Sequence, residues 1–242
     1  MVRAMKKEFV VPTGYRLDTG DSEGSRGPAA GHFNGRRVRA VVFDAFGTLC
    51  EIRDKRKPYS RLAQSYPDRK LARQLLMTRP LSIGAAVLEL KATGFDVNRI
   101  ETDLAAELAS IRLYPEVLGV LHELRAKGFM LAIASNLAAP YAEPLLRLLP
   151  FEFDAYAWSF EVGYLKPDPR IFADVCDRLH VRPDQALMVG DTFDADYEGS
   201  VNAGMLALYL NRDGRHLKAV PSIQTLAELP ARLVSTGARE RV

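Results

Sequence analysis

Short apolar runs without polar alternation recur along the chain. They cover residues 38–43, 129–135, 155–159, 186–190 and 205–210. Runs of this length bounded by polar or glycine residues predict buried strands. Strands that are apolar on both faces are typical of a parallel sheet covered by helices on each side.

Segments with apolar residues at helical spacing separate these strands. The predicted helices cover residues 59–77, 81–93, 97–112 and 169–180, and a further helix opens at Pro115. In the segment 81–93, for example, Val87, Leu88 and Leu90 recur at the spacing of a helix face. Strands that alternate with helices predict an α/β fold with a parallel sheet.

Residues 1–36 differ from the rest of the chain because glycines and charges are scattered through them with little apolar periodicity. We interpret this segment as a flexible leader with a short strand around residues 9–12. Residues 1–39 hold eight Lys and Arg and four Asp and Glu, leaving 25 basic and 26 acidic residues in the remainder. The slight basic excess therefore belongs to the leader, and the composition argues against nucleic acid as a partner.

Apolar segments and cysteines indicate where in the cell the protein is expected. No apolar run approaches the roughly 18 residues of a membrane span, and the N-terminus lacks the apolar segment of a secretory signal. Cys50 and Cys176 form neither a disulfide framework nor a metal-ligand cluster. We therefore expect a cytoplasmic protein without a membrane partner.

Polar residues follow the predicted strands at their carboxyl ends. Asp44 ends the first, Ser135 and Asn136 end the second, and Asp191 ends the fourth, with Asp196 five residues further. Ligands of parallel sheets bind beyond this edge, so these side chains should meet there. Together with Lys166, in "LKPDPRIF", they offer a nucleophile, phosphate-binding donors, a cation and a metal site, as phosphoryl transfer requires.

Four motifs carry a resemblance to a known family. "VVFDAFGTL", "LAIASN", "LKPDPRIF" and "VGDTFDADYEGSVNAGM" are similar to the motifs of the haloacid dehalogenase-like (HAD) hydrolase superfamily. The resemblance runs from about Ala40 to Leu210. It implies a Rossmann-like doubly wound parallel sheet core, residues 37–50 and 115–242, with a small all-α helical cap, residues 51–114, inserted after the first strand.

By this resemblance Asp44 is the nucleophile and forms a covalent aspartyl intermediate. Thr48, Ser135 and Asn136 are expected to bind the transferring phosphoryl group. Lys166 binds it as well, and also neutralises charge and orients Asp44.

The resemblance also implies a Mg²⁺ ion. Its ligands are Asp44, Asp191 and the backbone carbonyl of Phe46, with Asp196 in support. Elementary electrostatics agrees, because carboxylates that converge without a cation repel one another and raise each other's pKa. A hard divalent ion relieves this repulsion and bridges phosphate oxygens.

Phe46 departs from the family pattern. Phosphatases of the superfamily usually carry an aspartate there, which donates a proton to the leaving group and then activates water, and phenylalanine can do neither. Three functions stay open. The first is hydrolysis of a small phosphorylated metabolite with a good leaving group. The second is C–halogen hydrolysis, as in the 2-haloacid dehalogenases, which carry an aromatic residue at this position and dispense with the metal. The third is phosphate binding with little or no catalysis.

The predicted insertion begins with the basic run "RDKRK", residues 53–57. This run either meets a second anionic group on the substrate or is a solvated loop. The insertion is modest in size, which favours a small molecule over a protein as substrate. We expect a monomer or a homodimer.

Overall fold

A parallel sheet forms the centre of the molecule. The structure, a computed structural model, describes residues 31–214 and 219–235. Within these residues the main sheet has six strands in the order β10-β9-β8-β3-β6-β7. The bounds are β3 (Ala40–Phe43), β6 (Met130–Ser135), β7 (Ala155–Trp158), β8 (Ala186–Gly190), β9 (Leu206–Leu210) and β10 (Ser222–Ile223). All pairs are parallel. The predicted α/β fold is confirmed, with the first strand starting at Ala40 instead of residue 38.

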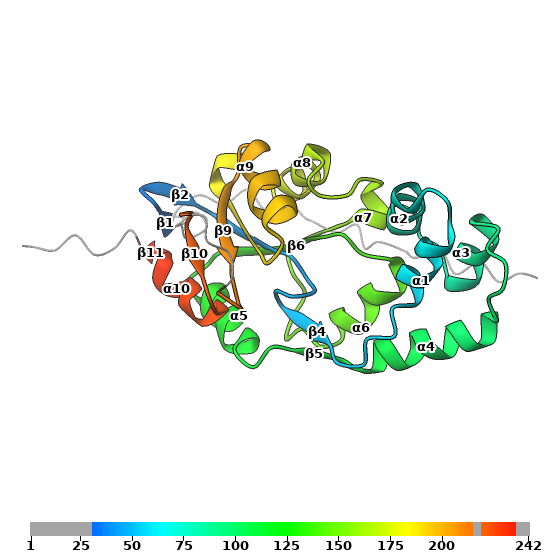
Figure 1. Ribbon diagram of the computed structural model, residues 1–242. Coiled ribbons are helices and arrows are strands. Elements are labelled where there is room, and N and C mark those ends of the chain that lie inside the picture. Colours follow the sequence, from blue (N-terminus) through cyan, green and yellow to red (C-terminus); the bar gives the residue numbers. More distant parts are fainter. Residues whose placement is uncertain (1–30, 215–218, 236–242) are drawn as a thin grey trace, which may run out of the picture.

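Helices cover both faces of this sheet, as its apolar strands require. Side chains of a strand alternate between faces, so Val41 and Phe43 enter one core cluster while Ala40 and Val42 enter the other. Helices α5 (Val117–Ala126) and α6 (Ala142–Leu146) pack on the first side. Helices α8 (Pro169–Arg178) and α9 (Gly199–Asn202) lie on the second (Figure 1). The sheet is therefore doubly wound.

The order of the strands places a binding crevice at the end of β3. The chain runs from β3 through β6 to β7 on one side, then returns to β8, β9 and β10 on the other. Phe43 pairs with both Ile133 and Val189, so β3, β6 and β8 end at nearly the same level. In an open α/β sheet such a switch point is where ligands bind.

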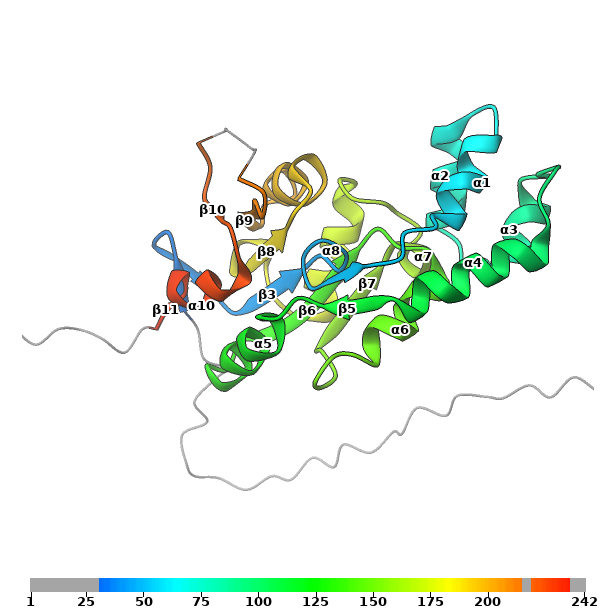
Figure 2. The same ribbon diagram turned by 60° about the horizontal axis from the view of Figure 1, so that its bottom comes forward.

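The long insertion follows β3 and carries helices α1 (Pro58–Ser65), α2 (Arg69–Met77), α3 (Ile83–Glu89) and α4 (Val97–Ala109). Figure 2 shows these helices at one end of the sheet. The prediction of a purely helical insertion is wrong at its base, where β4 (Cys50–Ile52) pairs antiparallel with β5 (Ile111–Leu113). These two strands join the insertion to the loop after β3.

Two predicted helices differ in detail. The helix expected over 59–77 is divided into α1 and α2, because Pro67 disfavours helical backbone at the residue before it and Asp68 caps α2 by accepting a hydrogen bond from the Leu71 amide. In α3, Val87 faces the core whereas Leu88 is 78% exposed. Only part of the expected apolar face is therefore buried.

The predicted leader is wrong for its last residues. Strand β1 (Gly31–Phe33) pairs with β2 (Arg36–Val38) and with β11 (Val234–Ser235). Asn34 and Gly35 join β1 to β2 with positive φ angles of 50° and 77°, as a two-residue hairpin turn requires. Residues 1–30, including the strand predicted around 9–12, lie outside the described residues.

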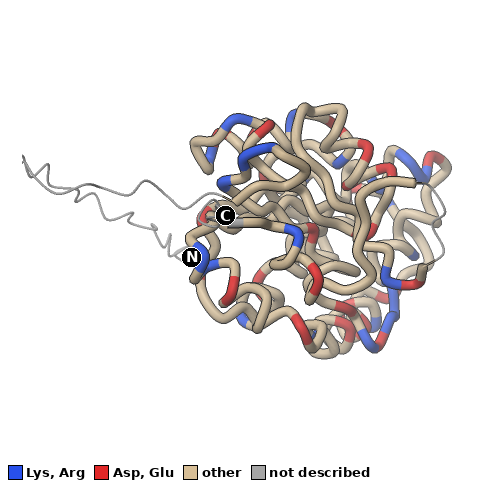
Figure 3. Tube along the Cα trace, turned by 90° about the vertical axis from the view of Figure 1, so that its left-hand side faces the viewer, with Lys and Arg blue, Asp and Glu red and all other residues tan. Residues whose placement is uncertain are grey.

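Two further properties of the described residues are the distribution of their charges and the length of their apolar helices. Acidic and basic positions are interspersed along the described chain in the view of Figure 3. Among the helices of the described residues, none is long and apolar enough to span a membrane.

Candidate active site

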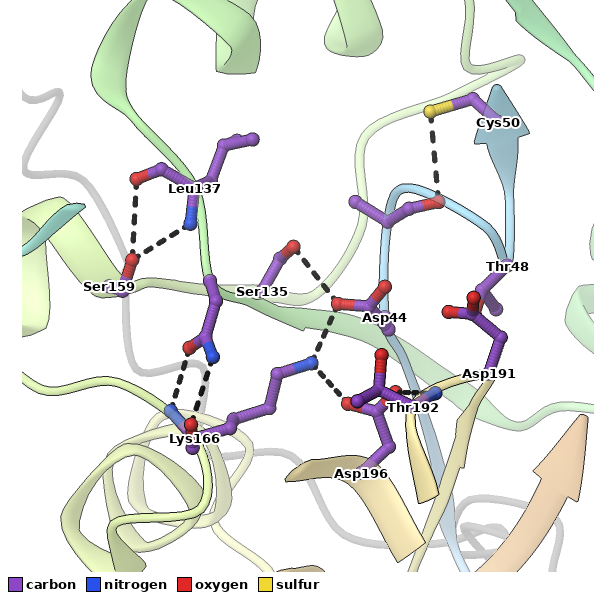
Figure 4. A network of polar contacts seen from close by, with 12 residues as sticks. Asp44, Thr48, Cys50, Ser135, Leu137, Ser159, Lys166, Asp191, Thr192 and Asp196 are labelled. Carbon is purple, nitrogen blue, oxygen red and sulfur yellow. Dashed lines mark hydrogen bonds and ion pairs between the residues drawn. The ribbon is translucent and has the colours of Figure 1, made fainter. Parts of the chain in front are cut away.

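Asp44 lies at the centre of the site, directly after β3, and is buried. Its Oδ1 atom accepts a hydrogen bond from Ser135 Oγ (3.0 Å) and forms an ion pair with Lys166 Nζ (2.6 Å), as Figure 4 shows. Ser135 is the last residue of β6, so the common level of the strand ends brings it to Asp44. No described residue donates a hydrogen bond to Oδ2. One carboxylate oxygen is thus held while the other remains available.

Lys166 lies between two carboxylates. Its Nζ is 2.6 Å from Asp44 Oδ1 and 2.6 Å from Asp196 Oδ1, and all three side chains are buried. Burial lowers the pKa of Lys166, but the two carboxylates outweigh this effect and raise it. The lysine is therefore a fixed cation.

Asn136 positions Lys166 through the backbone. Its Nδ2 donates to the Lys166 carbonyl (2.9 Å), and its Oδ1 accepts from the Lys166 amide (2.7 Å). Thr48 is also turned toward the protein, since its buried Oγ1 donates a long hydrogen bond to Asp191 Oδ1 (3.4 Å). The structure thus gives both side chains protein contacts, and the binding of phosphate by either one stays a prediction.

The predicted acidic residues converge. Ligand oxygens of Asp44, Asp191 and Asp196 lie within 4.8 Å of one another, and Asp196 is carried on a single π-helical turn, η3 (Phe193–Glu198). Glycine makes the approach possible, because a Cβ at Gly47 would lie 2.2 Å from Asp191 Oδ2 and one at Gly190 would lie 2.3 Å from Asp196 Cγ.

The charges of this cluster do not balance within the described residues. Burial, together with the charges of Asp44 and Asp196, raises the pKa of Asp191 to about 7. Burial also raises the pKa of Asp196, although Lys166 opposes it. Three carboxylates around one lysine leave two negative charges when all are ionised.

This donor set fits a hard divalent cation such as Mg²⁺. Both oxygens of Asp196 already accept hydrogen bonds, from Lys166 Nζ and from the Thr192 amide (2.9 Å). Asp44 and Asp191 are therefore the better candidates for direct ligands, with Asp196 in support. The contribution of the Phe46 carbonyl stays a prediction.

Arg212 is a site residue that the sequence reasoning missed. Its guanidinium donates to the carbonyl oxygens of Gly47 (2.9 Å) and Thr48 (2.7 Å), pairs with Glu116 (2.7 Å) and stacks over the Tyr114 ring at 3.7 Å. It thereby holds the loop after Asp44. Arg212 comes two residues after the end of β9, so the search for polar residues beyond strand ends would have found it.

Phe46 forms part of an apolar wall beside Asp44. Its ring meets the Tyr141 ring edge-on, with the two centroids 5.8 Å apart. The centroid of the Tyr141 ring lies 6.0 Å from that of Tyr59, in the insertion. These rings line a cavity of about 240 Å³ together with Met77 and Leu137. The cavity is lined both by residues of the insertion and by residues that follow β6.

Glu107, on α4, contributes an acid to the same cavity. Its carboxylate accepts hydrogen bonds from the Lys57 amide (2.6 Å) and from the Tyr141 hydroxyl. Burial raises its pKa despite these contacts. The contacts hold the insertion against Tyr141.

Comparisons with known proteins agree with the motifs. The model of a hydrolase family, the haloacid dehalogenase-like hydrolases, matches residues 38–204. The glyceraldehyde 3-phosphate phosphatase of Methanopyrus kandleri is 39% identical over 108 residues, which are 44% of this chain and 46% of that protein. The chain thus spans about half the length of the curated glyceraldehyde 3-phosphate phosphatases that it matches.

Two further proteins are similar over most of their length. The (S)-2-haloacid dehalogenase 1 of Pseudomonas sp. (strain CBS-3) is 29% identical over 224 residues, covering 81% of this chain and 97% of that protein. A HAD phosphatase structure from Thermococcus onnurineus superposes with a TM-score of 0.58 and 25% identity, covering 80% of this chain and 97% of that one. The chain therefore belongs to the haloacid dehalogenase-like hydrolase family.

Proposed function

We propose that this hydrolase is a Mg²⁺-dependent phosphohydrolase that acts through an aspartyl intermediate on Asp44. Its substrate is a small phosphorylated metabolite with a good leaving group. The acidic cluster of Asp44, Asp191 and Asp196 carries the proposal, because its uncompensated charge suits a divalent ion and a phosphate. The phosphatases among its relatives support the same reaction class.

The contacts of Asp44 suggest how the reaction proceeds. Lys166 and Ser135 hold the Asp44 carboxylate in place through Oδ1, and one oxygen of this carboxylate attacks the phosphorus. The bond from phosphorus to the leaving-group oxygen breaks, and that oxygen keeps the electron pair. Water then cleaves the aspartyl-phosphate, which releases inorganic phosphate and restores the carboxylate.

The surrounding cations balance charge during this reaction. The buried ammonium of Lys166 offsets the negative charge next to the nucleophile. Mg²⁺ bound at Asp44 and Asp191 would add positive charge against the phosphoryl oxygens. Arg212 holds the backbone of Gly47 and Thr48, whose loop borders the nucleophile.

Phe46 limits the choice of leaving group. General acid–base catalysis is worth about 10²–10⁴-fold, or roughly 3–5 kcal/mol of barrier. An alkoxide leaves poorly without a proton, whereas a phenolate or a carboxylate does not need one. We therefore expect aryl or acyl phosphates to react faster than alkyl phosphates.

A second candidate is hydrolysis of a 2-haloacid. The aromatic Phe46 and the apolar wall of Tyr59 and Tyr141 favour it, as does the dehalogenase relative that matches 81% of the chain. In this reaction one oxygen of the Asp44 carboxylate attacks C2, the carbon–halogen bond breaks and halide departs with the electron pair. Water then cleaves the ester to give a 2-hydroxyacid.

One parallel assay separates the candidates. Aryl, acyl and alkyl phosphates and 2-haloacids are each incubated with the enzyme in Mg²⁺ or in EDTA, with Asp44→Asn as the blank. Phosphate release that depends on Mg²⁺ supports the proposal, whereas halide release in EDTA overturns it in favour of the dehalogenase. No turnover, with binding of a phosphate mimic such as vanadate intact, favours the third candidate, a phosphate-binding protein. The cytoplasmic location and the oligomeric state stay predictions.

A further inference from the structure

The basic run at the start of the insertion is divided by its contacts. Arg53 pairs with Glu51 at 3.2 Å. Arg56 pairs with Asp54 at 2.9 Å and with Asp103, on α4, at 3.1 Å. The two arginines are thus neutralised within the insertion and its base.

The two lysines of the run behave differently. The side chains of Lys55 and Lys57 form no ion pair or hydrogen bond with any residue that the structure describes. Both line a cavity of about 340 Å³ that Phe46, Gly47 and Asp191 line as well. The ammonium groups of the run that remain unpaired are therefore the ones next to the candidate active site.

The acids of this cavity are already engaged. Glu51 accepts from Arg53, and Glu107 accepts from the Lys57 amide and the Tyr141 hydroxyl. Asp191 belongs to the cluster that suits a metal ion. None of these acids pairs with the exposed side chain of Lys55 or Lys57, so both charges can meet an anion of the substrate.

Lys57 also has a fixed backbone. Its φ and ψ angles are 55° and 48°, in the left-handed region that non-glycine residues rarely adopt. The hydrogen bond from its amide to the buried Glu107 carboxylate (2.6 Å) holds it there, although Pro58, which begins α1, favours extended backbone at the residue before it. Lys57 lines the apolar cavity beside Phe46 as well, so its position links the two spaces.

From these contacts we propose that Lys55 and Lys57 form a second anion subsite, and that the substrate carries a carboxylate or a second phosphate on its leaving group. The inference rests on the proposed phosphohydrolase function and narrows its substrate class. The cavity, at the small end of the range for ligand sites, suits a leaving group of a few carbons or a single ring. Its second anion then faces Lys55 and Lys57 while its phosphoryl group lies at Asp44.

Matched aryl phosphates test this subsite, because their phenolate leaving groups depart without an acid catalyst. The 3- and 4-carboxyphenyl phosphates are compared with the 3- and 4-carbamoylphenyl phosphates, which have the same shape but no charge. With wild-type enzyme and Mg²⁺ we expect kcat/KM to favour the acid over its amide by about tenfold in at least one pair, the effect of one charged hydrogen bond.

Substitutions assign the preference to the two lysines. In the double variant Lys55→Gln, Lys57→Gln the ratio of acid to amide should fall to about one. In the control Lys70→Gln, which removes an exposed lysine of α2 outside this cavity, the ratio should be kept. Equal kcat/KM for acid and amide in both wild-type pairs, or a preference that survives the double substitution, rejects the subsite alone. No hydrolysis of any of the four esters overturns the phosphohydrolase proposal and the subsite with it.

Discussion

The ion-pair bridge of Lys166 provides the sharpest test of the site, through the substitution Lys166→Met. Methionine keeps much of the side-chain volume but removes the charge that lies 2.6 Å from both Asp44 and Asp196. Their side chains are 11% and 2% exposed, so little solvent replaces the ammonium. Breaking a buried pair by removing one partner costs about 3–5 kcal/mol. This is a large part of the roughly 5–15 kcal/mol that stabilises an ordinary domain.

The loss should depend on pH in a defined direction. Burial raises the pKa of Asp196 and Lys166 opposes this effect, so in the variant the Asp196 carboxylate relieves the repulsion by taking up a proton. The native state then binds more protons than the unfolded chain, so the stability of the variant rises as the pH falls. The difference from wild type should therefore shrink between pH 8 and pH 5.5.

Urea denaturation in EDTA at both pH values measures these free energies of unfolding. The control is Arg147→Met, whose guanidinium pairs with Glu143 in an exposed setting, so the loss of stability should stay within about 1 kcal/mol. A loss below about 1 kcal/mol for Lys166→Met at pH 8, or one as large at pH 5.5 as at pH 8, would refute the reasoning.

Other predictions concern catalysis and metal binding. Asp44→Asn should reduce hydrolysis of aryl phosphates to background in a folded protein, and retained turnover would reject Asp44 as the nucleophile. Phe46→Asp should speed alkyl phosphate hydrolysis, by up to about 10²–10⁴-fold, and an unchanged rate in a well-folded variant would contradict our account of the missing acid. The pKa of Asp191 is raised to about 7. Mg²⁺ affinity, measured by calorimetry, should therefore weaken roughly tenfold per pH unit below pH 7 and level off above it. An affinity that does not change from pH 5.5 to 8 would count against this linkage. Gly47→Ala forces a Cβ to within 2.2 Å of Asp191 Oδ2 at a φ of +93°. Thermal unfolding should therefore show a loss of about 1–3 kcal/mol in the free energy of unfolding, and calorimetry should show weaker Mg²⁺ binding. Wild-type values for both would show that the loop relaxes freely.

Strand prediction succeeded where burial is complete. The runs at β3, β6 and β8 are apolar on both faces, and each strand ends at or next to the first polar site residue, Asp44, Ser135 or Asp191. Such runs are readable because a parallel strand covered on both sides tolerates few polar side chains. The candidate nucleophile and its partners could be named for the same reason.

Some misses had signals in the sequence. Asn34-Gly35 is a typical hairpin turn, and it joins two strands inside the segment that we predicted to be a leader. Tyr66-Pro67-Asp68 combines a residue restricted by proline with a helix N-cap, and it divides the predicted helix 59–77. Both are local patterns that apolar periodicity alone does not reveal.

Other features had no local signal. The pairing of β4 with β5 joins residues about sixty positions apart, as in Glu51 with Arg112. The contacts of Arg212 with Gly47 and Thr48 span more than 160 positions. Long-range contacts of this kind depend on how the loops leave the sheet, which no periodicity describes.

The sequence by itself determined the α/β class, the family and the identity of the residues at the strand ends, because hydrophobic patterning and short motifs are local properties. Only the tertiary structure decided that Lys166 and Ser135 hold the same oxygen of Asp44, and that Asn136 holds Lys166. It also decided that Lys55 and Lys57 remain unpaired among the described residues while their neighbouring arginines do not. The physical reason is that an ion pair forms only when two side chains meet within a few ångströms, and the register of the sheet and the path of the insertion set that distance.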